Sequence, residues 1–284
     1  MVWFLIARFY SRVSRTLSRH LGWRGRGLGF FLRHVNFDTV VWVHGTPMFF
    51  DHRVAACYTW LIGGEWNEPE THQFLRAVIL GIGIPVRFVD VGANVGEMIV
   101  DVGRFKNVHE AIAFEPNPLC ARALRISALL CDLTKVKIVE KVVKDSRTAA
   151  RFLAKPENPG NAGIAWDGET DGIALQATTL DHELEGAAGP TVVLIDVEGA
   201  ELLVIRGAQE FIRRARPLLI FEYNELGRSH YTLDGVRAVL GHSYEIFRLG
   251  PGGLLDRNLE ETWNCVAVER SGVFYQPCMA RLRP

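Results

Sequence analysis

The sequence predicts an α/β protein in which helices cover both faces of a mostly parallel sheet. Apolar runs of strand type alternate with helical patterns from residue 86 to residue 223, and most of the loops between them are short. Three of these runs end in an acidic residue and a turn, at Asp90, Glu115 and Asp196. Because ligands of such sheets bind at the carboxyl ends of the strands, we expect these acids to share one ligand site.

The pattern divides the 284 residues into three parts. Residues 1–35 form a basic amphipathic helix and a linker, residues 36–84 a hairpin and a helix, and residues 85–284 the ligand-binding domain. The formal net charge is zero, yet seven arginines precede the first acidic residue, Asp38. Residues 1–22 therefore fit either a helix that packs on its own domain, which we favour, or a peripheral contact with a membrane surface or an acidic partner.

The middle part carries two local signals. Two runs of β type between Thr39 and Phe50 flank Gly45-Thr46 and predict a hairpin. Asn67 and Glu70 have the spacing of a capping box, which predicts the start of a helix that ends at Gly81.

The third part contains the alternating elements. The predicted strands and helices are strand 86–91, helix 95–105, strand 111–115, helix 118–131, strand 136–143, strand 191–196, helix 200–213 and strand 217–223. The interval 145–178 breaks this rhythm with prolines and glycines, and predicts a β-hairpin or long loop inserted beside the site. Two further strands are expected at 243–249 and 263–269, joined through a Gly-Pro-Gly-Gly turn region.

The loop after the first of these strands indicates the ligand. Its sequence over residues 88–96 is Phe-Val-Asp-Val-Gly-Ala-Asn-Val-Gly, in which Asn94 occupies a position where a positive φ is expected. Such a turn can bring backbone N–H groups close to a ligand. The dinucleotide fingerprint would need glycines at 94 and 97, where the chain has Asn94 and Glu97. Glu97 at the start of the helix also argues against a pyrophosphate there, since like charges repel.

The acid after the second strand suggests a nucleoside. Glu115 lies 23 residues beyond Gly92 and can accept hydrogen bonds from both ribose hydroxyls. Asn117 and Pro118 then open the next helix as cap and first-turn residue. An adenosine without phosphate points to S-adenosyl-L-methionine.

Three segments in order resemble the FkbM family of S-adenosylmethionine-dependent methyltransferases. They are the loop from Asp90 to Gly96, the pair Glu115-Pro116, and the segment Ile195-Asp-Val-Glu-Gly-Ala-Glu201. The resemblance covers about residues 60 to 225 and also includes Thr179-Leu180-Asp181 and Glu222. It implies a Rossmann-like class I methyltransferase fold, in which the last two strands form an antiparallel pair. One departure is Leu194, which stands where family members often carry a lysine.

The resemblance and the loop geometry together predict the cofactor site. The residues expected to bind the cofactor are Asp90, Gly92, Ala93, Asn94, Gly96, Glu115 and Pro116. Asp90 would bind the amino-acid end of the donor or order the loop, and Glu115 would bind the ribose.

The catalytic prediction centres on Asp196. A carboxylate near the transferred methyl could take the proton from a hydroxyl acceptor as the new bond forms. Glu198 and Glu222 are expected on the same rim as catalytic partners, and Glu201 lies near them. Such a crowd of acids could hold Mg²⁺, but we favour a site without metal, because acids that begin a helix often serve only as caps. His230 is a weaker candidate for the base.

The sequence thus predicts an O-methyltransferase acting on a hydroxyl of a small molecule, sugar or natural product. Two alternatives remain: a nucleotide-cofactor oxidoreductase, and a non-catalytic, membrane-peripheral binding protein with a methyltransferase-like core. Nucleic acid is not an expected partner, because the basic residues lack interleaved aromatic residues. The five cysteines show no metal or disulfide spacing, which favours reduced thiols in a cytoplasmic protein. The oligomeric state cannot be read from the pattern.

Overall fold

A computed structural model describes residues 9, 36–54, 56–57, 60, 66–153, 163–164 and 172–283. Apart from Phe9, the amphipathic helix expected within residues 1–22 lies outside the described residues, as does the linker that follows it. Within the described part of the chain, no helix is long and apolar enough to cross a bilayer.

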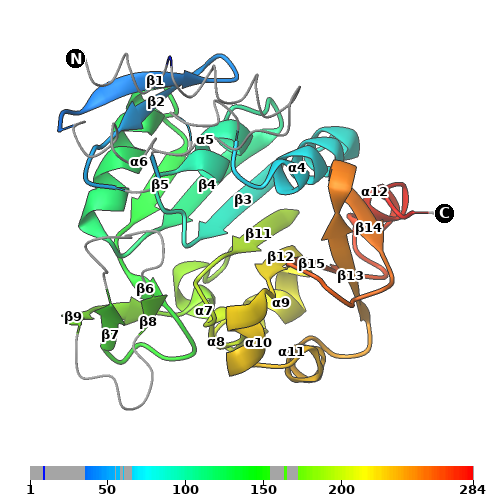
Figure 1. The fold of residues 1–284 in the computed structure, drawn as a ribbon. Helices are drawn as coiled ribbons and strands as arrows, with labels where there is room; N and C mark the ends of the chain where they lie inside the picture. The colour runs from blue at the N-terminus through cyan, green and yellow to red at the C-terminus, as the bar shows by residue number, and fades with distance from the viewer. Residues whose placement is uncertain are drawn as a thin grey trace.

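An eight-stranded sheet forms the centre of the molecule (Figure 1). From one edge to the other its strands are β5 (Val136–Val139), β4 (Val108–Phe114), β3 (Val86–Val91), β11 (Thr191–Ile195), β12 (Leu218–Glu222), β15 (Asn264–Glu269), β13 (Tyr244–Gly250) and β14 (Leu254–Asp256). The first five are parallel, and β15 runs antiparallel to both β12 and β13. The predicted parallel sheet and the antiparallel C-terminal pair are therefore confirmed.

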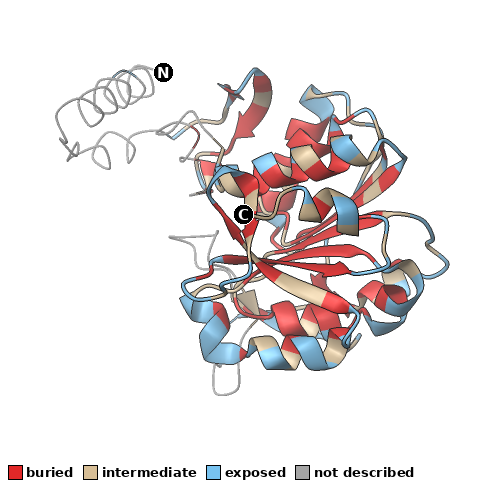
Figure 2. Ribbon diagram, turned by 90° about the vertical axis from the view of Figure 1, so that its right-hand side faces the viewer, coloured by how far each residue is buried: buried red, intermediate tan, exposed pale blue. Residues whose placement is uncertain are grey.

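Helices cover both faces of this sheet, as Figure 2 shows with the buried strands between two helical layers. One face carries α4 (Pro69–Ile82), α5 (Glu97–Gly103), α6 (Pro118–Leu130) and α12 (Tyr275–Met279). The other carries α7 (Leu180–Glu183), α8 (Glu201–Arg206), α9 (Gln209–Ala215) and α11 (Leu233–Leu240). Alternate strand residues serve the two cores: Phe88 joins the first, whereas Val89 joins the second.

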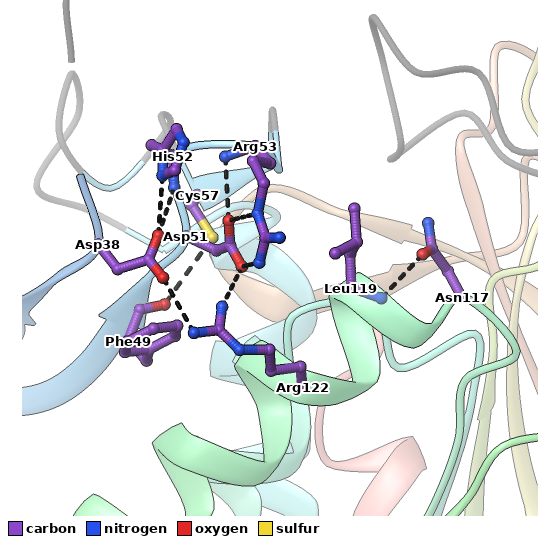
Figure 3. Close-up of polar contacts among 9 residues, drawn as sticks. All are labelled: Asp38, Phe49, Asp51, His52, Arg53, Cys57, Asn117, Leu119 and Arg122. Carbon is purple, nitrogen blue, oxygen red and sulfur yellow. Dashed lines mark hydrogen bonds and ion pairs between the residues drawn. The ribbon is translucent and has the colours of Figure 1, made fainter. Parts of the chain in front are cut away.

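The predicted hairpin is present as β1 (Thr39–Val43) and β2 (Thr46–Phe50), with His44 and Gly45 at positive φ in the turn. Its buried residues belong to the same hydrophobic cluster as α4 and the central sheet. Polar contacts fasten it to α6 (Figure 3): the Arg122 guanidinium binds Asp38 at 3.0 Å and the buried Asp51 at 2.5 Å. Asp51 also pairs with Arg53, so two arginines balance this acid.

Several predicted boundaries differ from the structure. The capping box was wrong: the N-cap of α4 is Glu68, without a side-chain cap, and Asn67 instead donates a hydrogen bond to Glu97. This helix ends at Gly83, whose φ of 70° suits glycine, and not at Gly81. The helix expected over 200–213 is divided into α8 and α9 around Gly207, where an added Cβ would lie 2.1 Å from the Lys144 carbonyl oxygen.

The strand expected over 136–143 is divided into β5 and β6 (Val142–Val143). After β12, helix α10 (Glu225–His230) precedes α11, in a stretch to which the pattern assigned no element.

The expected insertion forms a small sheet of its own. Strand β7 (Ala150–Leu153) pairs with β8 (Gly163–Ile164) and β9 (Ile173–Leu175), and β10 (Ala177–Thr178) pairs with β6. Phe152 anchors this sheet in a third hydrophobic cluster. The insertion lies beside the carboxyl ends of the parallel strands, where the predicted site is.

Candidate active site

The loop after β3 is held by the next strand. The N–H groups of Gly92 and Ala93 donate to the Phe114 carbonyl at 2.9 and 3.0 Å, and Asn94 adopts the predicted positive φ, 48°. The Gly96 N–H donates to the Ala93 carbonyl. We expected these N–H groups to face a ligand, but these three bind within the protein, so the loop contributes mainly its shape.

Gly92 allows two turns to approach each other closely. The Asp196 N–H donates to the Val91 carbonyl at 2.9 Å, and a Cβ on Gly92 would lie 1.8 Å from the Asp196 carbonyl oxygen. Because β4 and β11 flank β3 on opposite sides, the turns meet where the strand order reverses. That is where open α/β sheets bind ligands.

Glu115 joins the two turns at the end of β3 and β4. One carboxylate oxygen accepts from the Asn94 N–H at 2.8 Å, and the other accepts from the Asn117 N–H at 2.7 Å. The side chain is 5 % exposed, and burial raises its pKa to about 7 despite these two donors. Each oxygen retains a lone pair, so Glu115 can still accept from a ligand hydroxyl.

A cavity, the insertion-side pocket, opens next to Glu115. Phe114, Val142, Val143, Phe152 and Ile164 give it apolar walls, and Asn94, Glu115, Lys141, Asp196 and Glu198 contribute polar groups. Apolar walls with a few convergent polar groups are typical of sites that bind small molecules. The residues from β7 and β8 were not predicted individually, because only the folded insertion brings them to this edge.

A second cavity, the helix-side pocket, lies on the other side of the loop. Gly92, Asn94 and Asp196 line both pockets. The helix-side pocket is acidic: Glu68, Asp90, Glu97 and Asp196 line it together with Asn67 and Asn264. Such a lining suits a ligand group that carries positive charge.

Asp90 is the most buried acid of the helix-side pocket. It is 2 % exposed, and its Oδ2 has no hydrogen-bond partner. Burial, followed by repulsion from Glu115, raises its pKa to about 8. Its cross-strand neighbour is Leu194, so the residue that departs from the family pattern lies directly beside this acid.

Sequence reasoning missed the polar network around the helix-side pocket. Glu97 accepts from Trp60 Nε1 at 2.5 Å and from Asn67 Nδ2 at 3.0 Å. His72 lies between Glu97 and Asp101, and its pKa rises to about 9 because the hydrogen bonds to both acids outweigh burial. Glu68 accepts from Asn264 Nδ2 at 2.8 Å, across 196 positions of sequence. No local pattern could reveal that pair.

Asp196, Glu201 and Glu222 meet at the ends of β11 and β12. One oxygen of each carboxylate lies within 4.8 Å of the others. Burial and the nearby Glu222 raise the pKa of Asp196 well above its ordinary value, and burial with repulsion from Glu198 raises the pKa of Glu222 to about 8. Glu198 lines the insertion-side pocket at a φ of 56°, a conformation uncommon outside glycine and asparagine.

The predicted site residues thus lie near one another. Asp90, Gly92, Ala93, Asn94, Glu115, Pro116, Asp196 and Glu198 line one or both pockets. Glu222 adjoins Asp196, whereas Gly96 packs on Leu124 behind the loop at a φ of 87°. His230 lies against Gly199, where a Cβ would be 2.8 Å from its ring.

The sheet order, the reversed strand β15 and two pockets at the strand ends define a class I methyltransferase fold. The chain belongs to the FkbM methyltransferase family, because the model of the methyltransferase FkbM domain matches residues 90–245. No curated protein matches the sequence.

Solved structures of methyltransferases resemble the fold. Methyltransferase FkbM from Methylobacillus flagellatus is 18 % identical with a TM-score of 0.46, and the match covers 75 % of this chain but 52 % of that one. TYW2 of M. jannaschii, solved with AdoMet, is 14 % identical with a TM-score of 0.43, and the match covers 82 % of this chain and 84 % of that one. A putative O-methyltransferase from Klebsiella pneumoniae is 13 % identical with a TM-score of 0.44, and the match covers 93 % of this chain and 99 % of that one. The chain thus spans about half the length of the FkbM structure.

The family implies S-adenosylmethionine as methyl donor, and the residues of the two pockets fit it. The buried, unpartnered oxygens of Asp90 and Asn94 are acceptors that a bound ligand could satisfy. The acidic lining of the helix-side pocket suits a ligand with an ammonium and a sulfonium, and Glu115 beside apolar walls suits a nucleoside.

Proposed function

We propose that the protein transfers a methyl group from S-adenosylmethionine to a hydroxyl of a small molecule, glycan or natural product. The observation that carries the proposal is the position of Asp196, which lines both pockets where they adjoin at the loop after β3. A carboxylate there can lie beside both a donor that spans the two pockets and an acceptor that approaches the same edge.

The assignment of the two pockets follows from their chemistry. Glu115 and the apolar wall of Phe114 and Val142 would hold the nucleoside in the insertion-side pocket. Asp90 and Glu68 would hold the amino-acid end in the helix-side pocket. The bound donor supplies an electrophilic methyl group on a positively charged sulfur. The main contribution of the pocket walls is then to hold the two reactants in line.

Asp196 is the proposed general base or orienting group for the acceptor hydroxyl. Its pKa is raised by burial and by Glu222, which brings a carboxylate closer to the basicity that proton transfer at neutral pH requires. Glu198, on the wall of the insertion-side pocket, would contact the acceptor. Glu222 would act through Asp196, by repelling its negative charge.

Two measurements test this function. Titration of the purified protein with S-adenosylhomocysteine and with NADH distinguishes a methyltransferase from an oxidoreductase, and binding of the first alone is expected. A screen with radiolabelled S-adenosylmethionine over alcohol-bearing metabolites and glycans then identifies the acceptor. With that acceptor, Asp196→Asn should lower kcat at least about 100-fold while S-adenosylhomocysteine binding persists. Failure to bind S-adenosylhomocysteine would refute the function.

A further inference from the structure

The acids at the ends of β11 and β12 include oxygens that no protein group satisfies. Glu201 Oε1 accepts from the N–H groups of Val197 and Gly199, at 3.0 and 3.1 Å, which fixes this carboxylate. Its Oε2 has no partner, and neither has Oε2 of Glu222. The two side chains are 0 % and 8 % exposed. Water therefore has little access to either oxygen, and a buried acceptor without a partner is costly.

In the described part of the chain, the same acids also have no lysine or arginine as an ion-pair partner, and this holds for Asp196, Glu201 and Glu222 alike. The cluster of Asp38, Asp51 and His52 under the hairpin is different, because Arg53 and Arg122 bind its acids (Figure 3). Two buried carboxylates beside the half-buried Asp196 are costly when all are ionised, and protons or a bound cation would relieve that cost.

We propose that Asp196, Glu201 and Glu222 bind a divalent metal cation. Carboxylate oxygens are the ligands that the hard cations Mg²⁺, Mn²⁺ and Ca²⁺ prefer. Three oxygens spaced evenly around one Ca²⁺ lie at most about 4.0–4.5 Å apart, which is √3 times its bond length to oxygen. The three oxygens here, all within 4.8 Å of one another, are therefore close to the spacing that Ca²⁺ requires. Mg²⁺ or Mn²⁺ would require a small inward rotation of the side chains.

The cation would lie at the edge of both pockets, because Asp196, one of its three ligands, lines both of them. Three protein ligands leave coordination positions of a six-coordinate ion free, and a hydroxyl that entered from either pocket could occupy one. The ion would polarise a hydroxyl held there, and Asp196 would then orient the acceptor through the ion instead of acting as the base. This role rests on the proposed function, whereas the binding of the ion does not.

Direct metal binding tests the proposal without an acceptor. The full chain is stripped with a chelator, dialysed, and titrated with Mn²⁺ at pH 8 while free Mn²⁺ is followed by electron paramagnetic resonance. We expect one Mn²⁺ per chain, displaced by Mg²⁺ or Ca²⁺. Binding should also release protons, visible as a dependence of the calorimetric heat on the buffer, because protonated carboxylates must ionise.

Matched variants locate the ion. Glu222→Gln and Glu201→Gln each keep the shape of the side chain and should weaken Mn²⁺ binding at least about tenfold. Two control variants should leave Mn²⁺ binding unchanged. Glu210→Gln removes an exposed acid on α9, and Asp38→Asn alters the other acidic cluster. Circular dichroism and thermal unfolding of each variant show whether it is folded. If Glu222→Gln does not fold, the Mn²⁺ affinity of Glu201→Gln alone tests the site.

Two results would overturn the proposal: no Mn²⁺ bound to the wild-type chain at millimolar concentration, or binding unchanged in the folded glutamine variants. The first result would also arise if the acids instead held the ammonium group of an acceptor. S-adenosylhomocysteine is titrated into the same preparation. Binding of S-adenosylhomocysteine without binding of Mn²⁺ would disprove only the metal site. Binding of Mn²⁺ without binding of S-adenosylhomocysteine would disprove only the proposed function.

Discussion

The carboxylate of Glu115 accepts a hydrogen bond from the backbone N–H of Asn94, so the acid at the end of β4 holds the loop that follows β3. The other oxygen binds the N–H of Asn117, the N-cap of α6. A residue that sequence reasoning assigned to the ligand alone therefore also fixes the shape of the site. Loss of this carboxylate should disturb stability and ligand binding together.

Glu115→Gln tests this double role. A glutamine offers one acceptor oxygen, so one of the two backbone N–H groups would face an amide NH2 and lose its partner. We expect a loss of about 1–3 kcal/mol in the free energy of unfolding and weaker binding of S-adenosylhomocysteine. Urea unfolding and calorimetric titration measure the two effects. Glu140→Gln, on a partly exposed acid paired with Arg125, is the control and should change neither.

Gly92→Ala tests the contact between the turns after β3 and β11. The new Cβ would lie 1.8 Å from a backbone oxygen, which no side-chain rotation can relieve. The expected cost is about 3 kcal/mol or more in the free energy of unfolding. Gly45→Ala is the matched control: its φ is also positive, at 76°, but nothing lies within 4 Å of the added atom. It should cost about 1–2 kcal/mol. Equal costs would contradict the close approach.

The ion pairs under the hairpin predict an effect on stability alone. Arg122→Met removes a guanidinium from Asp51, whose side chain is fully buried, and leaves it with Arg53. The free energy of unfolding should fall by about 2–4 kcal/mol, measured with urea. Arg125→Met removes an exposed pair with Glu140 and should cost less than about 1 kcal/mol. A similar loss in both would show that the hairpin does not depend on the Arg122 bridge.

The stability of the unliganded chain should fall as the pH rises from 5.5 to 8.5. The folded state raises the pKa of Glu115 to about 7 and the pKa values of Asp90 and Glu222 to about 8, mainly by burial. In that range the folded chain therefore holds protons that the unfolded chain has released. The pKa of His72 is raised to about 9, so its stabilising charge is also lost as the pH rises.

The acids whose pKa is lowered, such as Asp51 and Glu183, change stability only below this window. We expect a decrease of more than about 2 kcal/mol between pH 5.5 and pH 8.5, measured by urea unfolding at constant ionic strength. Constant or rising stability over that range would show that the buried acids are ionised and paired in solution.

The sequence predicted the sheet and the site to different extents. The strands β3, β4, β11 and β12 were predictable because β-branched and apolar runs of this length carry an acid within one residue of their ends, at Asp90, Glu115, Asp196 and Glu222. Asn94 was recognised because few residues tolerate its φ. Helix ends were less predictable: Asn67 has the sequence of a cap, yet a tertiary hydrogen bond to Glu97 takes its side chain.

The second half of the site depended on contacts distant in sequence. Asn264 meets Glu68 only because β15 inserts between β12 and β13, and that placement has no local signal. Gly163 and Ile164 reach the insertion-side pocket through pairing with β7. Asp196, Glu201 and Glu222 were each recognised in the sequence. Their carboxylate oxygens lie within 4.8 Å of one another only because β11 and β12 are adjacent in the sheet.

Leu194 supplies the last prediction, because it pairs with Asp90 across β11 and β3 and stands where the family often has a lysine. Leu194→Lys would put an ammonium group beside a carboxyl whose pKa burial raises to about 8. The ionised form of Asp90 should then be favoured, which lowers its pKa toward the value in the unfolded chain. The loss of stability between pH 5.5 and pH 8.5 should therefore be smaller in this variant than in the wild type. Leu194→Met, which keeps the position apolar, should retain the wild-type slope. Equal slopes in all three proteins would mean that Asp90 is already ionised, and that its positive partner comes from elsewhere in the site.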